Sequence, residues 1–120
     1  MTSSLKQSEL LTEAKKLLET KGWNQFSLAR DKHGQSTFYD DTEACSYCAV
    51  GAVWAASKIP NAMHTSTPEY ASVASTIQLL QSVIPGNAYT SSWNDVPGRT
   101  KEEVLTLFDT AIEKAKENER

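Results

Sequence analysis

The sequence predicts a mostly α single domain of four main helices, in which three helices pack around a central buried one. The central stretch, 42–57, carries no charge after its second residue and no proline, and it is too long for a typical strand. Three other stretches place apolar side chains at helical spacing, namely 5–21, 67–84 and 100–115. A length of 120 residues, with 39% hydrophobic and 22% charged residues, is typical of one globular domain covering 1–120.

The first helix is expected over 5–21, and residues 1–4 before it are expected to fray. Its apolar positions form one stripe: Leu10, Leu11, Ala14, Leu17 and Leu18. Gly22 stands where a helix ends in a left-handed residue, and Trp23 follows as the apolar side chain that packs against that end.

The segment 24–41 is less regular and fits either a short β-hairpin or an ordered loop. Phe26 and Leu28 are separated from Phe38 by a turn-rich sequence at 31–34. Two short strands are marginal by themselves, so a hairpin here needs support from the helices.

The central helix is expected over 42–57, with Thr42 as its N-cap. One side is a ridge of small residues, made of Ala44, Cys48, Ala52 and Ala56. Gly51 lies beside this ridge and costs about 1 kcal/mol relative to alanine in a helix interior. Close packing of a neighbouring segment, or access for a ligand, would offset that cost, and we favour close packing.

The third helix is expected to begin at Thr67 as N-cap with Pro68 in the first turn, and to end at Ile84 before a Pro-Gly-Asn sequence. A loop over 87–98 follows. Thr100 and Glu103 have the spacing of a capping box that opens the fourth helix. The tail, 116–120, alternates in charge and is expected to fray.

Composition excludes several classes of function. No stretch is long and apolar enough to span a bilayer, and the N-terminus lacks the apolar core of a signal peptide, so we expect a cytoplasmic protein without a membrane partner. The net charge of −3 argues against general nucleic-acid binding. No glycine-rich phosphate loop or other cofactor motif is present, so no cofactor is predicted.

Between Trp54 and Val96 the chain has only three charged residues, namely Lys58, Glu69 and Asp95. The same stretch is rich in Ser, Thr, Asn and Gln. Burial together with a neutral surface explains this composition, and a hydrogen-bonding surface for a ligand or a protein partner is the alternative.

Three sequence elements are considered together: Gly22-Trp23, the C-A-V-G-A sequence that starts at Cys48, and Trp93-Asn94-Asp95 followed by Gly98-Arg99-Thr100 and the helix with Glu103-Val104-Leu105. With these elements the chain resembles a family of small proteins encoded by bacteria and phages and known only as a domain of unknown function. The resemblance covers most of the chain, from the first helix to the fourth, and implies a fold and a phage-like setting but no mechanism. It also implies that Cys48, and not Cys45, is the family's usual cysteine.

The sequence from Trp93 to Thr100 holds the candidate binding residues. Asn94 and Asp95 have side chains that shape loops by bonding to nearby backbone, and Arg99 could pair with Asp95 or Asp31. Each of these polar residues therefore has a structural role available. Trp93 fits a lid on the core, and beside Asn94 and Asp95 it also fits the wall of a small-molecule pocket.

The two cysteines suggest chemistry of a different kind. With Cys45 in the first turn of the central helix, the helix dipole would favour its thiolate, but neither His33 nor His64 is placed by spacing near a thiol. The set Cys45, Cys48, His33 and His64 also has the ligand types that zinc prefers, although the intervals do not match a compact zinc finger.

The leading functional hypothesis is a non-enzymatic module that binds a protein or small molecule through the loop from Trp93 to Arg99. The alternatives are a small enzyme that uses Cys48 or Cys45 with a histidine, or Asp95 with Arg99, and a zinc-binding domain.

Overall fold

The computed structural model describes residues 5–61 and 68–120. Its helices are α1 (Gln7–Thr20), α2 (Ala49–Ser57), α3 (Pro68–Ser82), the 3-10 turn η2 (Pro85–Asn87), α4 (Thr90–Asn94) and α5 (Lys101–Asn118). Its strands are β1 (Ala29–Arg30), β2 (Ser36–Thr37) and β3 (Ser46–Tyr47). The chain is thus a mostly α domain with four main helices and a small antiparallel sheet. The sequence predicted this architecture apart from the third strand and the short helix α4, which lies within the predicted loop over 87–98.

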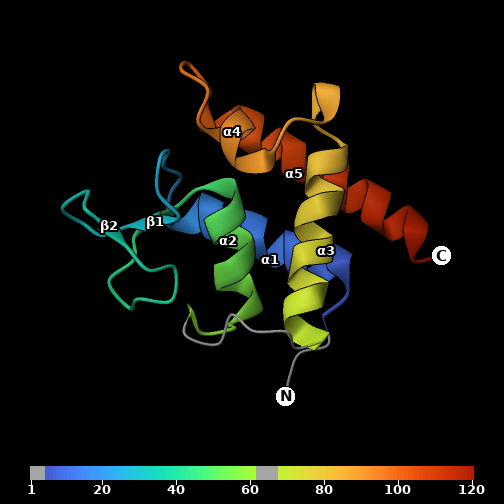
Figure 1. The fold of residues 1–120 in the computed structure, drawn as a ribbon, viewed down its shortest axis with the longest axis horizontal. Helices are drawn as coiled ribbons and strands as arrows, with labels where there is room; N and C mark the ends of the chain where they lie inside the picture. Colours follow the sequence, from blue (N-terminus) through green and yellow to red (C-terminus); the bar gives the residue numbers. More distant parts are fainter. Residues whose placement is uncertain (1–4, 62–67) are drawn as a thin grey trace.

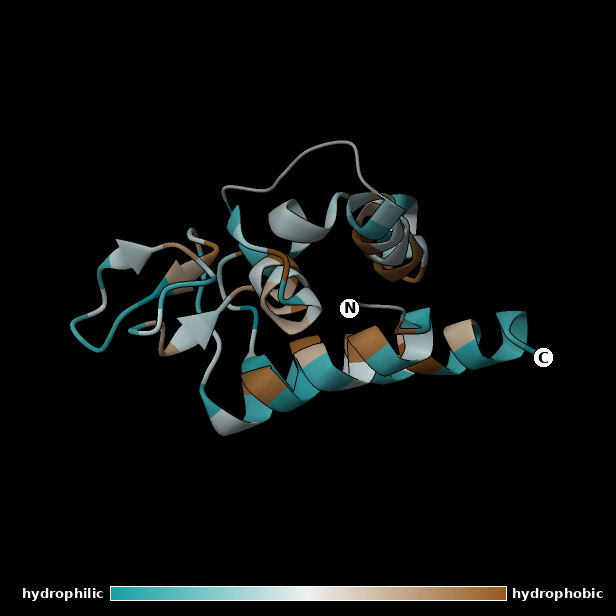
Figure 2. Cartoon of the chain, turned by 90° about the horizontal axis from the view of Figure 1, so that it is seen from below, coloured by the Kyte–Doolittle hydropathy of each residue, from teal (hydrophilic) through white to brown (hydrophobic). Residues whose placement is uncertain are grey.

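The main helices lie in two layers. α1 and α5 run side by side, and α2 and α3 cross over them on one side, while the sheet projects beyond one end of the helices (Figures 1 and 2). The core fills the space between the layers with side chains that are fully buried, among them Leu11, Leu18, Val53, Leu80 and Phe108. α1 contacts both α2 and α5 extensively, so it forms the centre of the helical packing together with α2.

Both terminal helices begin with a carboxylate of the third helical residue bonded to the backbone of the N-cap. The predicted capping box of α5 is confirmed, because the Thr100 hydroxyl accepts the Glu103 N–H and the Glu103 carboxylate accepts the Thr100 N–H. At α1 the Glu9 carboxylate accepts the Lys6 N–H. The predicted cap of α3, Thr67, and the histidine His64 lie outside the described residues.

The segment 24–41 forms the hairpin that was one of its two predicted structures. β1 pairs with β2 in antiparallel register, with Ala29 opposite Thr37 and Arg30 opposite Ser36. The turn is closed at Asp31, whose N–H donates to Gln35 O and whose carboxylate accepts the N–H groups of His33 and Gln35. β3 pairs with the other side of β1, so the sheet order is β2-β1-β3.

The predicted start of the central helix is wrong, since α2 begins at Ala49 and not after Thr42. Residues 45–48 bond instead to the hairpin: Cys45 N–H donates to Arg30 O, and Cys48 N–H donates to Leu28 O. These strand bonds require extended backbone, which a helix over 42–48 would exclude. Cys48 is consequently the N-cap, and its Sγ accepts the Gly51 N–H at 3.2 Å. Cys45 is not in a helix, and the predicted effect of a helix dipole on its thiol does not apply.

Close packing accounts for the glycine at position 51, and this is the explanation that we favoured from the sequence. A Cβ at this position would lie 1.9 Å from the carbonyl oxygen of Leu28, so only glycine lets α2 approach the hairpin backbone. This contact places the first turn of α2 directly against β1.

Two polar contacts join the terminal helices. Lys15 of α1 lies 2.7 Å from the Asp109 carboxylate of α5, and this hydrogen bond raises the pKa of the lysine. Glu119 accepts hydrogen bonds from both the N–H and the hydroxyl of Ser8. The tail that was expected to fray therefore continues as helix through Asn118 and ends in a contact with the start of α1. No helix in the described part of the chain is long and apolar enough to cross a membrane.

Candidate functional site

The candidate binding residues surround one buried side chain, Asn94 at the end of α4, which is 0% exposed. Its Oδ1 accepts the indole N–H of Trp23 at 2.7 Å and the Ala49 N–H at 3.0 Å. Its Nδ2 donates to the backbone oxygen of Asn24 and to the carboxylate of Asp95. All four hydrogen-bonding positions of the amide are used, so Asn94 connects α4 to the segment after α1 and to the first turn of α2.

Asp95 extends this network to the surface. Besides the Asn94 amide, its Oδ1 accepts the backbone N–H of Phe26 at 2.9 Å. Phe26 has a φ of 66°, a left-handed conformation that is rare for a large side chain. The Asp95 carboxylate thus holds an unfavourable backbone conformation that presents the Phe26 ring to solvent, where the residue is 69% exposed.

Gln25 fixes the same two segments to each other. Its side-chain amide donates to the backbone oxygens of Asn94 and Val96, both at 3.0 Å. Val96 is 42% exposed, so an aliphatic and an aromatic side chain are displayed on two segments that are bonded together.

Trp93 and Arg99, which lie on either side of Val96 in the sequence, form a stacked pair. The Arg99 guanidinium lies 3.9 Å from the centre of the Trp93 ring, and its Nε donates to the Trp93 carbonyl oxygen. Arg99 forms its ion pair with Glu103 at 3.5 Å, and not with Asp95 or Asp31 as the sequence suggested. The pair closes the loop onto the start of α5. We refer to Phe26, Trp93, Val96 and Arg99 together as the 26–99 face.

Phe26 is the member of this face that the sequence analysis missed. Its place in an apolar alternation suggested an ordinary hairpin residue, and nothing in the local sequence shows a left-handed phenylalanine. The conformation follows from its bond to Asp95, which is 69 residues away in the sequence.

The cysteines lie in different surroundings. Cys48 is buried, and burial raises the pKa of its thiol, which disfavours the thiolate that nucleophilic catalysis needs. Cys45 is exposed, with its Sγ 3.4 Å from the Glu43 oxygen. Among the hydrogen bonds of the described residues, none joins His33 to either thiol.

The proposed zinc ligands in the described residues do not form a cluster. Cys48 uses its sulfur as a helix cap, and His33 is exposed at the hairpin turn. In the described ranges, 5–61 and 68–120, no three His, Cys, Asp or Glu residues lie close enough to hold a metal ion. His64 is outside those ranges.

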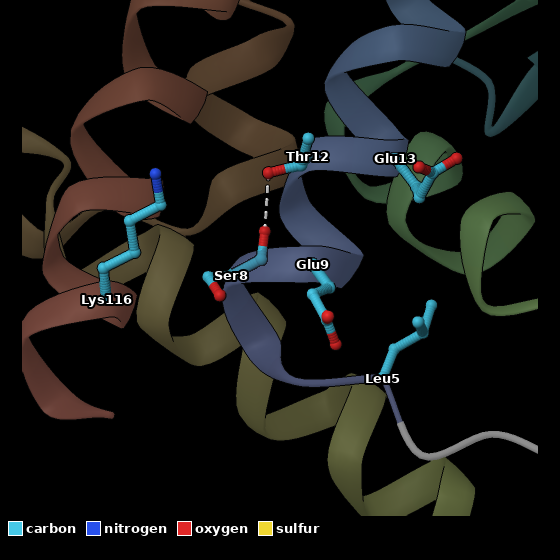
Figure 3. Close-up of a pocket in the computed structure, with 6 residues that line it drawn as sticks. All are labelled: Leu5, Ser8, Glu9, Thr12, Glu13 and Lys116. Carbon is cyan, nitrogen blue, oxygen red and sulfur yellow. Dashed lines mark hydrogen bonds between the residues drawn. The ribbon is translucent and has the colours of Figure 1, made fainter. Parts of the chain in front are cut away.

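A surface groove of about 270 Å³ lies elsewhere, between the start of α1 and the end of α5 (Figure 3). Five of its residues come from the beginning of the chain and Lys116 from α5; they are Leu5, Ser8, Glu9, Thr12, Glu13 and Lys116. Lys116 lies 15 positions beyond the first residue of α5, or about 22 Å along the helix axis. The groove is therefore separate from the 26–99 face.

The weakly charged part of the sequence, from Trp54 to Val96, includes α3. Its exposed positions include Ala71, Ser72, Ser75 and Gln78, while Val73, Thr76 and Leu80 are buried. Along α3 the composition thus reflects burial on one side and a neutral polar surface on the other, which is the first of the two explanations.

Fold and site together define a small helical domain in which a loop contact is built on a buried asparagine. The chain belongs to a family of unknown function, DUF6197, whose model matches residues 2–114. The resemblance to a family of unknown function is thereby confirmed. No curated protein and no solved structure matches the chain.

Proposed function

We propose that this protein is a non-enzymatic module that binds a partner protein through the 26–99 face. The observation that carries the proposal is Phe26, a large aromatic residue held exposed in a left-handed conformation by Asp95. Such a conformation costs on the order of 1–2 kcal/mol, and strained backbone of this kind is concentrated at functional sites.

The composition of the face suits protein recognition. Aromatic residues and arginine supply most of the strong contacts in protein interfaces, and here Phe26, Trp93 and Arg99 lie around one loop contact. Because Asn94 and Gln25 fix both segments with hydrogen bonds, little conformational entropy remains to be lost on binding. In this proposal Asn94 positions the face from below and does not contact the partner.

A protein partner suits the 26–99 face better than a small molecule, the other ligand class that the sequence suggests. Phe26 and Val96 are exposed by 69% and 42%, so they offer side chains that a partner surface can enclose. The proposed setting is the cytoplasm. The resemblance to phage-encoded proteins suggests a host protein as the partner, with interference in a host pathway as the biological role.

The test is quantitative capture of a host partner by immobilised protein, comparing Phe26→Asn with the parent. Asparagine tolerates left-handed backbone, so this variant should be at least as stable as the parent while losing the ring. We expect captured partner to fall by tenfold or more, as for a central interface residue. Trp93→Ala and Arg99→Ala should weaken capture as well.

Phe38→Asn is the matched control, because Phe38 is also a phenylalanine and is 65% exposed but lies outside the 26–99 face. It should capture the partner as the parent does. If Phe26→Asn is folded and captures every partner at the parent's level, the proposal is wrong.

A further inference from the structure

Arg30 of β1 is a cation without an acidic partner in the described part of the chain. That part includes every Asp and Glu of the sequence, and none of their carboxylates forms an ion pair with the Arg30 guanidinium. The charge of Arg99, by contrast, is matched by Glu103. A guanidinium left without a counter-charge is suited to a carboxylate from another molecule.

The side chain of Arg30 is held in place by backbone oxygens on two sides. Its Nη1 donates to the Gly34 oxygen of the hairpin turn at 2.8 Å, and its Nη2 donates to the Gln25 oxygen at 3.0 Å. A guanidinium has five N–H donors, so three remain after these two bonds. Because the residue is only partly buried and its orientation is already fixed, little side-chain entropy is lost when it receives an anion.

The same bonds place Arg30 beside the 26–99 face. Gln25, whose carbonyl oxygen accepts the Nη2 bond, directly precedes Phe26 in the chain. The side chain of Gln25 is in turn bonded to the backbone oxygens of Asn94 and Val96. The guanidinium is thus attached to the residue before the exposed ring, on the segment that the Asn94 network fixes.

The carboxylates near Arg30 in the fold are engaged elsewhere. The Asp31 carboxylate accepts two backbone N–H groups of its own turn, and that of Asp95 accepts the Phe26 N–H. The segment 22–29 contains no charged residue. A carboxylate supplied by a partner would therefore complement a charge that the chain itself leaves unmatched.

We infer that the partner of the 26–99 face supplies a carboxylate to Arg30 and an apolar side chain to Phe26. This inference rests on the proposed function, and it names the element that is recognised: a protein segment in which Asp or Glu lies near an aromatic or aliphatic residue. A nucleic acid matches the surface less well, since a chain of net charge −3 repels a polyanion.

Selection from a library of random displayed peptides tests the inference with a defined probe. Peptides are selected on the immobilised parent protein, and those that also bind Phe26→Asn are discarded. The peptides that remain should carry Asp or Glu within a few residues of an aromatic or aliphatic side chain. Fluorescence anisotropy of one labelled peptide then measures its affinity for each protein variant.

A double-mutant cycle tests the contact between Arg30 and the carboxylate. Arg30→Gln, and separately the exchange of the peptide's acid for its amide, should each weaken binding by about tenfold or more. The two changes together should weaken it little more than either one. Arg30→Lys keeps the charge but not the planar fork, and it should retain part of the affinity.

Lys32→Gln is the matched control, because Lys32 is an exposed cation of the same hairpin that is not bonded to Gln25. It should leave the affinity within about twofold of the parent. Thermal unfolding verifies that each variant is folded. The exchange of the peptide's acid for its amide is measured on the parent, so it does not depend on the folding of any variant.

Three results would overturn the inference and leave the proposed function intact. They are peptides that need Phe26 but contain no acid, equal affinity of one such peptide for Arg30→Gln and the parent, and tighter binding of a phosphoserine peptide than of its Asp counterpart. The last result would make Arg30 a phosphate contact. A selection that yields no peptide dependent on Phe26 would contradict the proposed function, and the inference with it.

Discussion

At the scale of single residues, Asn94 is the side chain whose loss should affect the fold most. Asn94→Ala leaves the Trp23 indole N–H and the Ala49 N–H without their acceptor inside the protein. Unsatisfied buried groups cost about 1–3 kcal/mol each, so we expect the free energy of unfolding to fall by on the order of 3 kcal/mol. Urea unfolding followed by tryptophan fluorescence measures this change.

Asn118→Ala is the matched control for this prediction, since Asn118 is an exposed asparagine at the end of α5. It should change stability by no more than about 0.5 kcal/mol. An Asn94→Ala variant that loses less than about 1 kcal/mol would show that the buried network contributes little.

The sequence could assign a kind of role to such residues but not their partners. Side chains of Asn94 and Asp95 were expected to bond to nearby backbone, and the structure shows bonds to Asn24, Phe26 and Ala49 instead. Short polar side chains favour loops for local reasons, which sequence reveals. Which distant segment comes within hydrogen-bonding distance depends on the packing of the whole domain, which local patterns do not encode.

At the scale of elements, the junction of α2 and the hairpin depends on Gly51. Helix propensity alone predicts that Gly51→Ala stabilises α2 by about 1 kcal/mol. The 1.9 Å approach to the Leu28 oxygen predicts the opposite sign, because α2 and β1 must move apart. We expect a loss of about 2 kcal/mol or more, measured as the change in urea unfolding free energy.

Gly98→Ala separates this clash from backbone strain. Gly98 has a φ of 86° and open space around a Cβ, so alanine there meets strain alone, with a cost of about 1 kcal/mol. If Gly51→Ala proves as stable as the parent, the close approach of α2 to β1 is not the reason for glycine.

The starts of two helices, α5 and the central helix, were predicted with different accuracy, and the reason is physical. The capping box at Thr100 and Glu103 is encoded within four residues, and it was predicted correctly. The start of the central helix was not, because residues 44–48 carry no charge and no helix breaker. Their bonds to Arg30 and Leu28 outweigh this local preference, and the strand β3 that results has no signal of its own.

At the scale of the whole molecule, stability should decrease in alkaline solution. Burial, with a contribution from the Asp40 charge, raises the pKa of Tyr39 to about 12, and burial likewise raises the pKa values of Tyr47 and Cys48. These groups bind their protons more tightly in the fold than in the unfolded chain. Their contribution is complete below the unfolded values and is lost as pH rises through the folded ones.

The free energy of unfolding should therefore fall between about pH 9 and about pH 12, as measured by urea unfolding at a series of pH values. Tyr39→Phe removes one of the ionising groups and should make the decrease shallower at the upper end of this range. A stability that is constant from neutral pH to about pH 12 would contradict the prediction.

The fold class was predictable because it depends on features that add up along the chain, namely length, composition and apolar stripes. The 26–99 face was predictable only in its second half, from Trp93 to Arg99. The first half, Phe26, owes its conformation to a hydrogen bond with Asp95, which is 69 residues away in the sequence.

The bond between Trp23 and Asn94 joins residues 71 positions apart, and this separation affects when the 26–99 face can form. During synthesis the ribosome releases Phe26 long before α4 exists, and the early chain lacks Asp95, whose carboxylate holds Phe26 in the complete fold. Contacts of such high sequence separation form late in folding because a long loop must first be closed. Recognition through this face would therefore be restricted to completed chains, and nascent or truncated copies would not compete for the partner.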